Sequence, residues 1–365
     1  MAATFAWVTF CICNFVFAPA LLGQAMDDSI VAKHVRLRIP VDRQWLGRET
    51  ISDLERCWEF VDSATGAKLP TRVLIVIQWQ NSMTAVDAEH ATLSIGMGDP
   101  AASSDAKGYL LHSAARELAR LALINLSGGA ASKEENWFLL QGMSEMVAHD
   151  FSNTVKRLGA AWAICYYLDR MSPLGLKQLA SRAEISGSQI DLRSAAPGIT
   201  LLTACGELFG RERLFKLFES LARKNLEESL TATFKTQASN LVNQWLARVR
   251  NYNAADVTIT TAEEAPELNR VMFVPDPAKA GGTLRVQLFA RDGANDLSPT
   301  GIFVLDESSH LVLQGNQGGT EGSRYTQFEI PIDAARPEGR YKLRLVAVDE
   351  GGNVRNWEAF YSIAR

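Results

Sequence analysis

Two short charged clusters near the middle of the chain carry the residue types that could do chemistry. The first, residues 116–120, reads Arg-Glu-Leu-Ala-Arg, and the second, residues 141–145, reads Gln-Gly-Met-Ser-Glu. Side chains four residues apart share one face of a helix, so Arg116 and Arg120 would project together. Glu117 can accept a proton, whereas an arginine stays protonated and has no lone pair to offer a metal ion. The clusters therefore predict ion pairing, with Glu145 as the expected partner of the arginines, or recognition of a carboxylate.

The spacing of the two clusters resembles the active site of the gluzincin, or peptidase-MA-like, metallopeptidases, the group that includes aminopeptidase N and thermolysin. In that group a His-Glu-x-x-His helix supplies two zinc ligands and a general base, and the next helix supplies a glutamate as third ligand. Here Arg116 and Arg120 stand at the histidine positions, Gln141 stands at the third-ligand position, and Glu117 alone keeps its chemistry. The resemblance therefore implies a degenerate site, formed by Arg116, Glu117, Arg120, Gln141 and Glu145, with no catalytic residue, no metal and no cofactor.

The resemblance extends over roughly residues 30–250 and rests on the order of further elements. Apolar strands are expected at 72–79 and 91–96, before a helix capped by Ser103, Ser104 or Asp105 that ends near Ser127. A second helix is expected at 133–149, opened by a capping box at residues 132–135. Further helices are expected at about 153–170, 174–184, 198–208, 211–224, 226–234 and 238–251.

The composition changes after Tyr252, where the helical period gives way to short alternating strands separated by Gly, Pro, Asp and Asn. Eight strands are expected, at 257–260, 270–274, 283–291, 301–305, 311–314, 325–332, 339–349 and 354–363. This pattern favours an Ig-like β-sandwich, and residues 337–353 resemble the penultimate-strand hairpin of bacterial Ig-like domains. In this strand Tyr341, Leu343, Leu345 and Ala347 share one face, with Lys342 and Arg344 on the other. A calcium-binding module that uses Asp292, Asp296 and Asp349 is the weaker alternative.

The expected fold class is therefore α+β. A mostly helical gluzincin-like domain with a small N-terminal sheet would span residues 30–251, and an all-β Ig-like sandwich would span residues 266–365. The boundary is expected between Tyr252 and Glu267, where acidic and small residues interrupt the helical period. The 365 residues are 47% hydrophobic, which suffices for two buried cores.

The amino terminus predicts export from the cytoplasm. Residues 2–20 are almost wholly apolar, and Gly23 and Ala25 are small residues at the positions that a signal peptidase reads, so residues 1–25 are expected to be a cleaved signal peptide. The absence of lysine and arginine from this segment leaves a retained anchor as the alternative. The expected location is the cell envelope of a bacterium, as a secreted or periplasmic protein. The remaining cysteines, Cys57, Cys165 and Cys205, predict buried thiols, with a bridge between the last two left open.

Two histidines flank the charged clusters. His112 precedes Arg116 by one helical turn, and His149 follows Glu145 by one turn. We expect the two histidines to lie at opposite ends of the helix pair, too far apart to share a metal ion. His34, His90 and His310 are dispersed, and no Gly-x-Ser-x-Gly motif indicates another hydrolase site.

The expected function is non-enzymatic: recognition of a protein or peptide, or scaffolding in the cell envelope, by a peptidase-like protein that has lost its metal. The alternative is an active metallopeptidase with unorthodox ligands. The net charge of −4, with both signs scattered along the chain, gives no argument for a nucleic-acid partner. After removal of the signal peptide we expect no membrane span, because no later stretch reaches about eighteen apolar residues.

Overall fold

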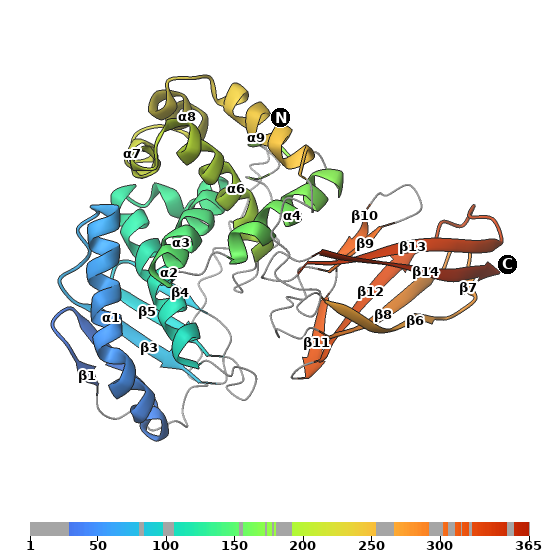
Figure 1. The fold of residues 1–365 in the computed structure, drawn as a ribbon, viewed down its shortest axis with the longest axis horizontal. Helices are drawn as coiled ribbons and strands as arrows, with labels where there is room; N and C mark the ends of the chain where they lie inside the picture. Colours follow the sequence, from blue (N-terminus) through green and yellow to red (C-terminus); the bar gives the residue numbers. More distant parts are fainter. Residues whose placement is uncertain are drawn as a thin grey trace, which may run out of the picture.

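The fold was analysed in a computed structural model, in which helices and strands both make up large parts of the chain, so the fold class is α+β (Figure 1). The structure describes residues 29–79, 84–97, 106–152, 156–171, 174–176, 179, 192–252, 266–291, 302–305, 311–314, 316–320, 323–348 and 354–364. The expected signal peptide, the strand at 257–260, the domain boundary, most of the helix at 174–184 and the three aspartates of the calcium alternative lie outside these residues. No helix among the described residues is long and apolar enough to cross a bilayer.

The N-terminal part contains a five-stranded sheet. Its strands are β1 (Ile30–Val31), β2 (Val35–Arg38), β3 (Val73–Gln78), β4 (Ala85–Asp87) and β5 (Thr92–Gly96), in the order β1-β2-β3-β5-β4. β2, β3 and β5 run parallel, and β1 and β4 are antiparallel edge strands. β3 alternates between buried and half-buried residues, because its buried face packs on helices. Strands β3 and β5 were expected from the sequence, whereas β1, β2 and β4 were not.

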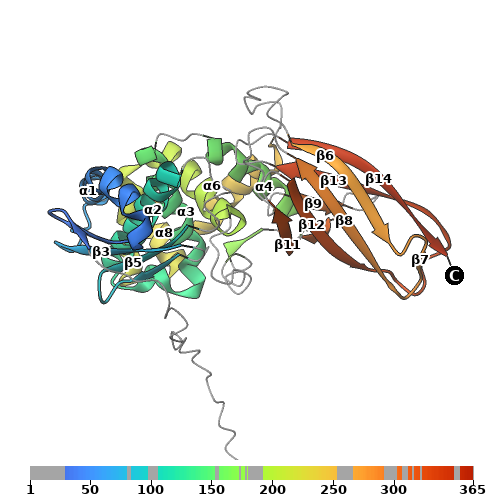
Figure 2. The same ribbon diagram turned by 90° about the horizontal axis from the view of Figure 1, so that it is seen from below.

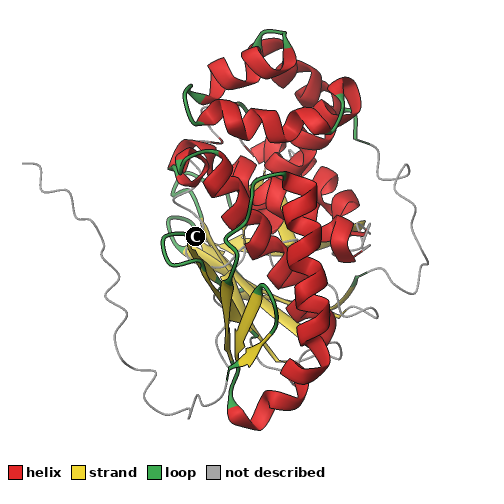
Figure 3. Ribbon diagram, turned by 90° about the vertical axis from the view of Figure 1, so that its left-hand side faces the viewer, coloured by secondary structure: helices red, strands yellow, loops and turns green. Residues whose placement is uncertain are grey.

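Two helices pack on this sheet (Figure 3). Helix α1 (Gln44–Thr65) contacts β2, and α2 (Ala106–Leu126) contacts β4 and β5. Helix α1 was not expected from the sequence, although its buried residues Leu54, Cys57, Trp58 and Val61 have the spacing of an amphipathic helix.

The remaining helices form a layer beside α2. They are α3 (Trp137–Ser152), α4 (Lys156–Met171), α6 (Leu192–Phe209), α7 (Glu212–Leu221), α8 (Leu226–Phe234) and α9 (Ala238–Arg250). The expected bounds of α8 were correct and those of α4, α7 and α9 were close. The expected starts of α3 and α6, residues 133 and 198, were wrong, because α3 begins at Trp137 and α6 begins at Leu192 and contains Pro197. The expected capping box was wrong: two short 3-10 turns, Ala130–Ser132 and Glu134–Asn136, precede α3, and neither begins with a side-chain cap. The hydroxyl of Ser132 instead donates to the carbonyl of Gly129, because the chain turns tightly between the helices.

Helices α3 and α6 approach each other at two glycines. A Cβ added to Gly142 would lie 2.4 Å from the backbone of Gly198, and one added to Gly198 would lie 1.9 Å from the carbonyl oxygen of Phe138. Only residues without a side chain permit this approach. Gly142 therefore fixes the position of the neighbouring Gln141 relative to the rest of the helical layer.

The C-terminal part contains two sheets that enclose a core. The first sheet has the order β10-β9-β13-β14-β7 and the second β11-β12-β8-β6. Their strands are β6 (Glu267–Val274), β7 (Ala278–Lys279), β8 (Thr283–Arg291), β9 (Ile302–Leu305), β10 (Leu311–Gln314), β11 (Asn316–Thr320), β12 (Ser323–Pro331), β13 (Gly339–Val348) and β14 (Val354–Ala364). Residues of both sheets, such as Val286 and Leu345, share one hydrophobic cluster. In Figure 2 these strands extend away from the helices.

Strand β13 faces two cores. As expected, Leu343, Leu345 and Ala347 are buried between the two sheets. On the opposite face, Val346 and Val348 are fully buried in the large cluster that the helices form. Since successive side chains of a strand point to opposite faces, β13 joins the core of the sheets to the core of the helices.

The three described cysteines are free and buried. No bridge joins Cys165 to Cys205; the thiol of Cys165 lies 3.3 Å from the hydroxyl of Thr200 instead. Burial raises the pKa of Cys57 and raises that of Cys205 to about 12, so both thiols stay protonated at neutral pH.

Candidate functional site

The two charged clusters face each other across the antiparallel helices α2 and α3. Three pairs of residues meet at successive turns: His112 with His149, Arg116 with Glu145, and Arg120 with Gln141. Each step along α2 is four residues forward and each step along α3 is four residues back. This ladder arises because one turn of each helix presents the same face to its neighbour.

Glu117 lies at the centre of the ladder and has no exposed surface. Its Oε1 accepts a hydrogen bond of 3.0 Å from Nε of Arg116 and one of 3.2 Å from the hydroxyl of Thr84. Its Oε2 accepts a hydrogen bond of 2.7 Å from Nη1 of Arg120. Both carboxylate oxygens are therefore held by partners, two of which are charged.

The arginines are themselves almost fully buried, with 8% of Arg116 and 4% of Arg120 exposed. Burial favours the neutral form of each guanidinium, but the carboxylates of Glu117 and Glu145 outweigh burial at Arg116, whose pKa is raised. At Arg120 burial prevails over the same carboxylates, with repulsion from Arg116 added, and its pKa is lowered. Both arginines remain charged, because the ordinary pKa of a guanidinium lies far above neutral pH. Two cations and two carboxylates thus occupy one buried region.

The helices are bridged differently from what the sequence predicted. Glu145 was the expected partner of the arginines, but the carboxylate closest to both Arg116 and Arg120 is that of Glu117 on their own helix. The bridge to α3 is a hydrogen bond of 2.6 Å from Nη2 of Arg120 to Oε1 of Gln141. Nη1 of Arg116 lies 3.8 Å from Oε2 of Glu145, which is an ion pair without a hydrogen bond.

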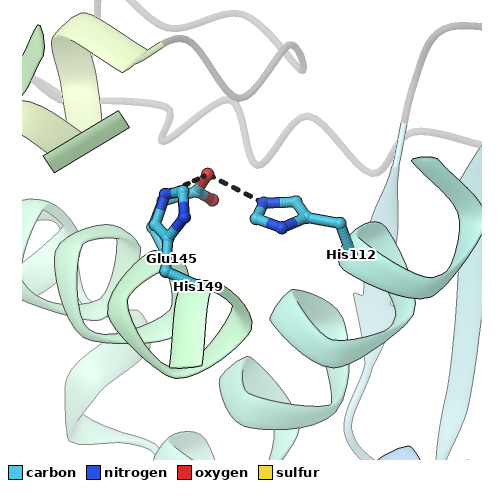
Figure 4. Close-up of side chains that lie close together, drawn as sticks. All are labelled: His112, Glu145 and His149. Carbon is cyan, nitrogen blue, oxygen red and sulfur yellow. Dashed lines mark hydrogen bonds and ion pairs between the residues drawn. The ribbon is translucent and has the colours of Figure 1, made fainter. Parts of the chain in front are cut away.

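Glu145 turns its other oxygen toward two histidines (Figure 4). Its Oε1 lies 3.0 Å from Nε2 of His112 and 3.7 Å from Nε2 of His149. The expectation that His112 and His149 lie at opposite ends of the helix pair was wrong, because their ring centroids are 5.1 Å apart. In an antiparallel pair, a residue near the start of the first helix meets one near the end of the second. The spacing in sequence already allowed this contact, since each histidine stands one turn from a cluster residue.

Two groups of described residues have the composition and proximity of metal ligands: His112, Glu145 and His149, and His34, Glu55 and Glu59. The second group has a structural role. Nδ1 of His34 lies 2.5 Å from Glu55, which also accepts hydrogen bonds from the backbone amides of His34 and Val35. The imidazole stacks on Trp58 with 3.9 Å between ring centroids. These contacts attach β2 to α1.

Comparisons with family models and with curated proteins give no peptidase relative. No family model matches this chain, and no curated protein matches it. A solved structure that it matches is the alkylpurine DNA glycosylase AlkC from Pseudomonas fluorescens, bound to DNA containing an abasic site analog. The two sequences are 14% identical, the match covers 72% of this chain and 82% of the glycosylase, and the TM-score is 0.23. A TM-score this low does not indicate a shared fold, so no property of the glycosylase is carried over.

These findings contradict the resemblance to the gluzincin metallopeptidases, and that assignment was wrong. The description of the chain as peptidase-like was therefore wrong as well. The physical reason lies in the motif itself: Arg-Glu-Leu-Ala-Arg is also the pattern of a helix whose own charges pair. Here Glu117 binds the arginines that stand one residue before it and three residues after it. A pattern that local ion pairing explains does not specify a family.

Proposed function

We propose that the protein is a non-enzymatic binding or scaffolding protein of the secreted or periplasmic space, whose partner is a protein or peptide. The observation that carries this proposal is the enclosure of Glu117, the carboxylate best placed for acid–base chemistry. Hydrogen bonds reach both of its oxygens and none of its surface is exposed, so it presents no oxygen to a substrate from solvent. A general base must reach the proton that it removes, and Glu117 reaches only its own neighbours.

The helical part would then serve as a rigid support. Its buried arginines pair with Glu117 and Gln141 instead of presenting guanidinium groups to an outside carboxylate. This favours a filled site over an open cleft. Buried networks of this kind, in which each charge lies beside an opposite charge, hold helices in one register, although their net effect on stability varies.

The contact surface would lie on the C-terminal part, which we interpret as an Ig-like β-sandwich. Two largely antiparallel sheets around a shared core, with a long β13–β14 hairpin, support this interpretation. Sandwiches of this class use their faces and loops for adhesion.

One face of the β13–β14 hairpin has the character of a protein-binding surface. Phe360 is 44% exposed, and the guanidinium of Arg340 lies 4.3 Å from the centroid of its ring. Lys342 pairs with Phe360 in register and lies on the same face, where its Nζ bonds Glu358 at 2.8 Å. Aromatic residues and arginine are enriched among the residues that contribute most to binding. The excess of positive charge favours an acidic partner surface.

The experiment is site-specific photo-crosslinking in the full chain. A photoreactive residue at position 360 should capture one protein from the envelope or culture fluid of the source cells. The same residue at Leu208, which is 55% exposed on α6, should not. The captured protein is then purified, and its affinity should fall at least about tenfold for Phe360→Ser and for Arg340→Gln, but not for Leu208→Ser. Equal crosslinking at both positions, or affinities unchanged by the hairpin variants, would show that this face of the hairpin is not the binding surface. Hydrolysis of a substrate by the parent, or salt-dependent binding of duplex DNA, would reject the function.

A further inference from the structure

We propose that His112, Glu145 and His149 form a binding site for a divalent transition-metal ion of the Zn²⁺ class. Each of these side chains can offer one nitrogen or oxygen atom to an ion, and these three atoms lie within 4.8 Å of one another. Figure 4 shows both imidazole rings and the carboxylate converging on one point between α2 and α3. The proposal goes beyond the proposed function and does not depend on it.

The donor set selects the class of ion. Two imidazoles and one carboxylate suit zinc and its neighbours in the first transition row, whereas calcium and magnesium prefer oxygen ligands alone. Glu145 and His149 are four residues apart on α3, so they project together, and α2 supplies His112 from the opposite side. The three side chains are at least 92% buried, since their exposed fractions are 8%, 3% and 3%. A site placed on two packed helices needs little reorganisation to bind an ion.

The surroundings of His112 orient its ring for coordination. Nδ1 of His112 lies 3.2 Å from the hydroxyl of Ser152, and that hydroxyl donates its own hydrogen to the carbonyl of Ala148 at 2.9 Å. The serine oxygen therefore accepts from Nδ1–H, which leaves the lone pair of Nε2 directed toward Glu145. Nε2 and Oε1 of Glu145 are 3.0 Å apart, so a cation must lie beside both atoms, either as a shared proton or as a metal ion. Metal-binding histidines commonly have such a partner on the second nitrogen.

Arg116 limits the affinity of this site. Its Nη1 lies 3.8 Å from Oε2 of Glu145, so its positive charge already neutralises part of the charge of that carboxylate. Repulsion between a guanidinium and a dication also weakens binding. Nε and Nη2 of Arg116 are directed to Glu117 and Thr84, which keeps most of its charge turned away from the histidines. We therefore infer a weaker site than one without a neighbouring arginine.

The test is a titration of the purified, EDTA-treated full chain with Zn²⁺ alone and with Co²⁺ alone. We expect one ion per chain and visible Co²⁺ bands of histidine coordination. The variants His112→Gln, His149→Gln and Glu145→Gln should each lower Zn²⁺ affinity at least about 100-fold. Ser152→Ala should lower it about 10- to 100-fold, and Ser152→Thr, which keeps the hydroxyl, should restore it. His90→Gln is the matched control, because it removes an exposed histidine whose partner is Asp87 and should change nothing.

The outcomes separate the proposal from its rivals. If His34→Gln abolishes binding and His112→Gln does not, the ion binds between β2 and α1 and the proposal is wrong. A folded parent that binds neither Zn²⁺ nor Co²⁺ leaves the His112–Glu145 contact as a proton-bridged pair and also overturns it. Should a histidine variant fail to fold, the Ser152 pair decides, since both of its members keep the buried histidines.

Discussion

Arg120 donates a hydrogen bond of 2.6 Å from Nη2 to Oε1 of Gln141, and this bond joins α2 to α3. The same guanidinium holds Glu117 through Nη1 at 2.7 Å. Its plane also lies against Trp137, with Cζ 5.3 Å from the ring centroid. The side chain of Arg120 therefore contacts its own helix and two residues of α3, namely Gln141 and the first residue, Trp137. Removal of this side chain should therefore destabilise the packing of the helical layer.

Replacing Arg120 with methionine should destabilise the protein by about 3–5 kcal/mol, because Glu117 keeps its buried charge and loses its closest cation. Chemical denaturation measures the effect. Arg248→Met is the control: its partner Glu207 is exposed, so the loss should stay below about 1 kcal/mol. Combining Arg120→Met with Glu117→Gln should cost less than the sum of the two single changes. An Arg120→Met protein as stable as the parent would mean that the network contributes nothing.

Alanine at Gly198 should destabilise the contact between α3 and α6. The new methyl group would overlap the carbonyl oxygen of Phe138 at 1.9 Å, so the helices must separate, at a cost of at least about 2 kcal/mol. Gly206→Ala on the same helix is the matched control. Its Cβ would lie 3.4 Å from Leu214, and alanine favours a helix by up to about 1 kcal/mol over glycine. Thermal melting should therefore move in opposite directions for the two variants; a shared direction would contradict the close approach.

The ion pair between α1 and α2 should give a measurable pH dependence. Hydrogen bonds from Lys107 and Arg56 hold the pKa of Asp53 below its ordinary value of 3.8. The folded protein thus binds this proton less tightly than the unfolded chain, so the stabilisation is complete above about pH 4 and disappears as the pH falls through the lowered pKa.

The variant Asp53→Asn should be less stable than the parent by under about 1 kcal/mol at pH 7 and equally stable at the lowest pH at which both fold. Urea denaturation across the pH range tests this. In a Lys107→Gln background, where one hydrogen bond to Asp53 is missing, the stability difference caused by Asp53→Asn should be smaller. A difference that grows toward acidic pH would have the wrong sign and would refute the assignment.

A fragment of residues 266–365 should fold on its own as an all-β unit, because both sheets close around their own core. It should be less stable than in the whole protein, since Val346 and Val348 would lose their contacts with the helical core. Val346→Ser tests this directly: it should cost about 2 kcal/mol in the full chain and almost nothing in the fragment, where the side chain is exposed. Circular dichroism and thermal melting give the readout. Helical signal, no cooperative transition, or equal costs in both proteins would contradict the interpretation.

The local periodicity of apolar residues in the sequence determined whether most segments form a helix or a strand. The apolar spacing predicted α8 as Leu226–Phe234, and the alternation predicted β8 and β10 with correct bounds. These elements can be recognised in the sequence because apolar residues recur about every 3.6 residues in a helix and every two residues in a strand. The two-residue strands β1 and β7 carry no such signal, since two residues cannot show a period.

Tertiary structure alone decided which faces meet. The sequence showed that His112, Arg116 and Arg120 share a face of one helix and that Gln141, Glu145 and His149 share a face of the next. It could not show the direction or rotation of the second helix. These bring His112 against His149 and place the carboxylate of Glu145 closer to His112 than to either arginine. Likewise, alternation placed Val346 on the outer face of β13, but only packing covered that face with helices. Residue spacing acts within one element, whereas the partner of a face depends on how the whole chain packs.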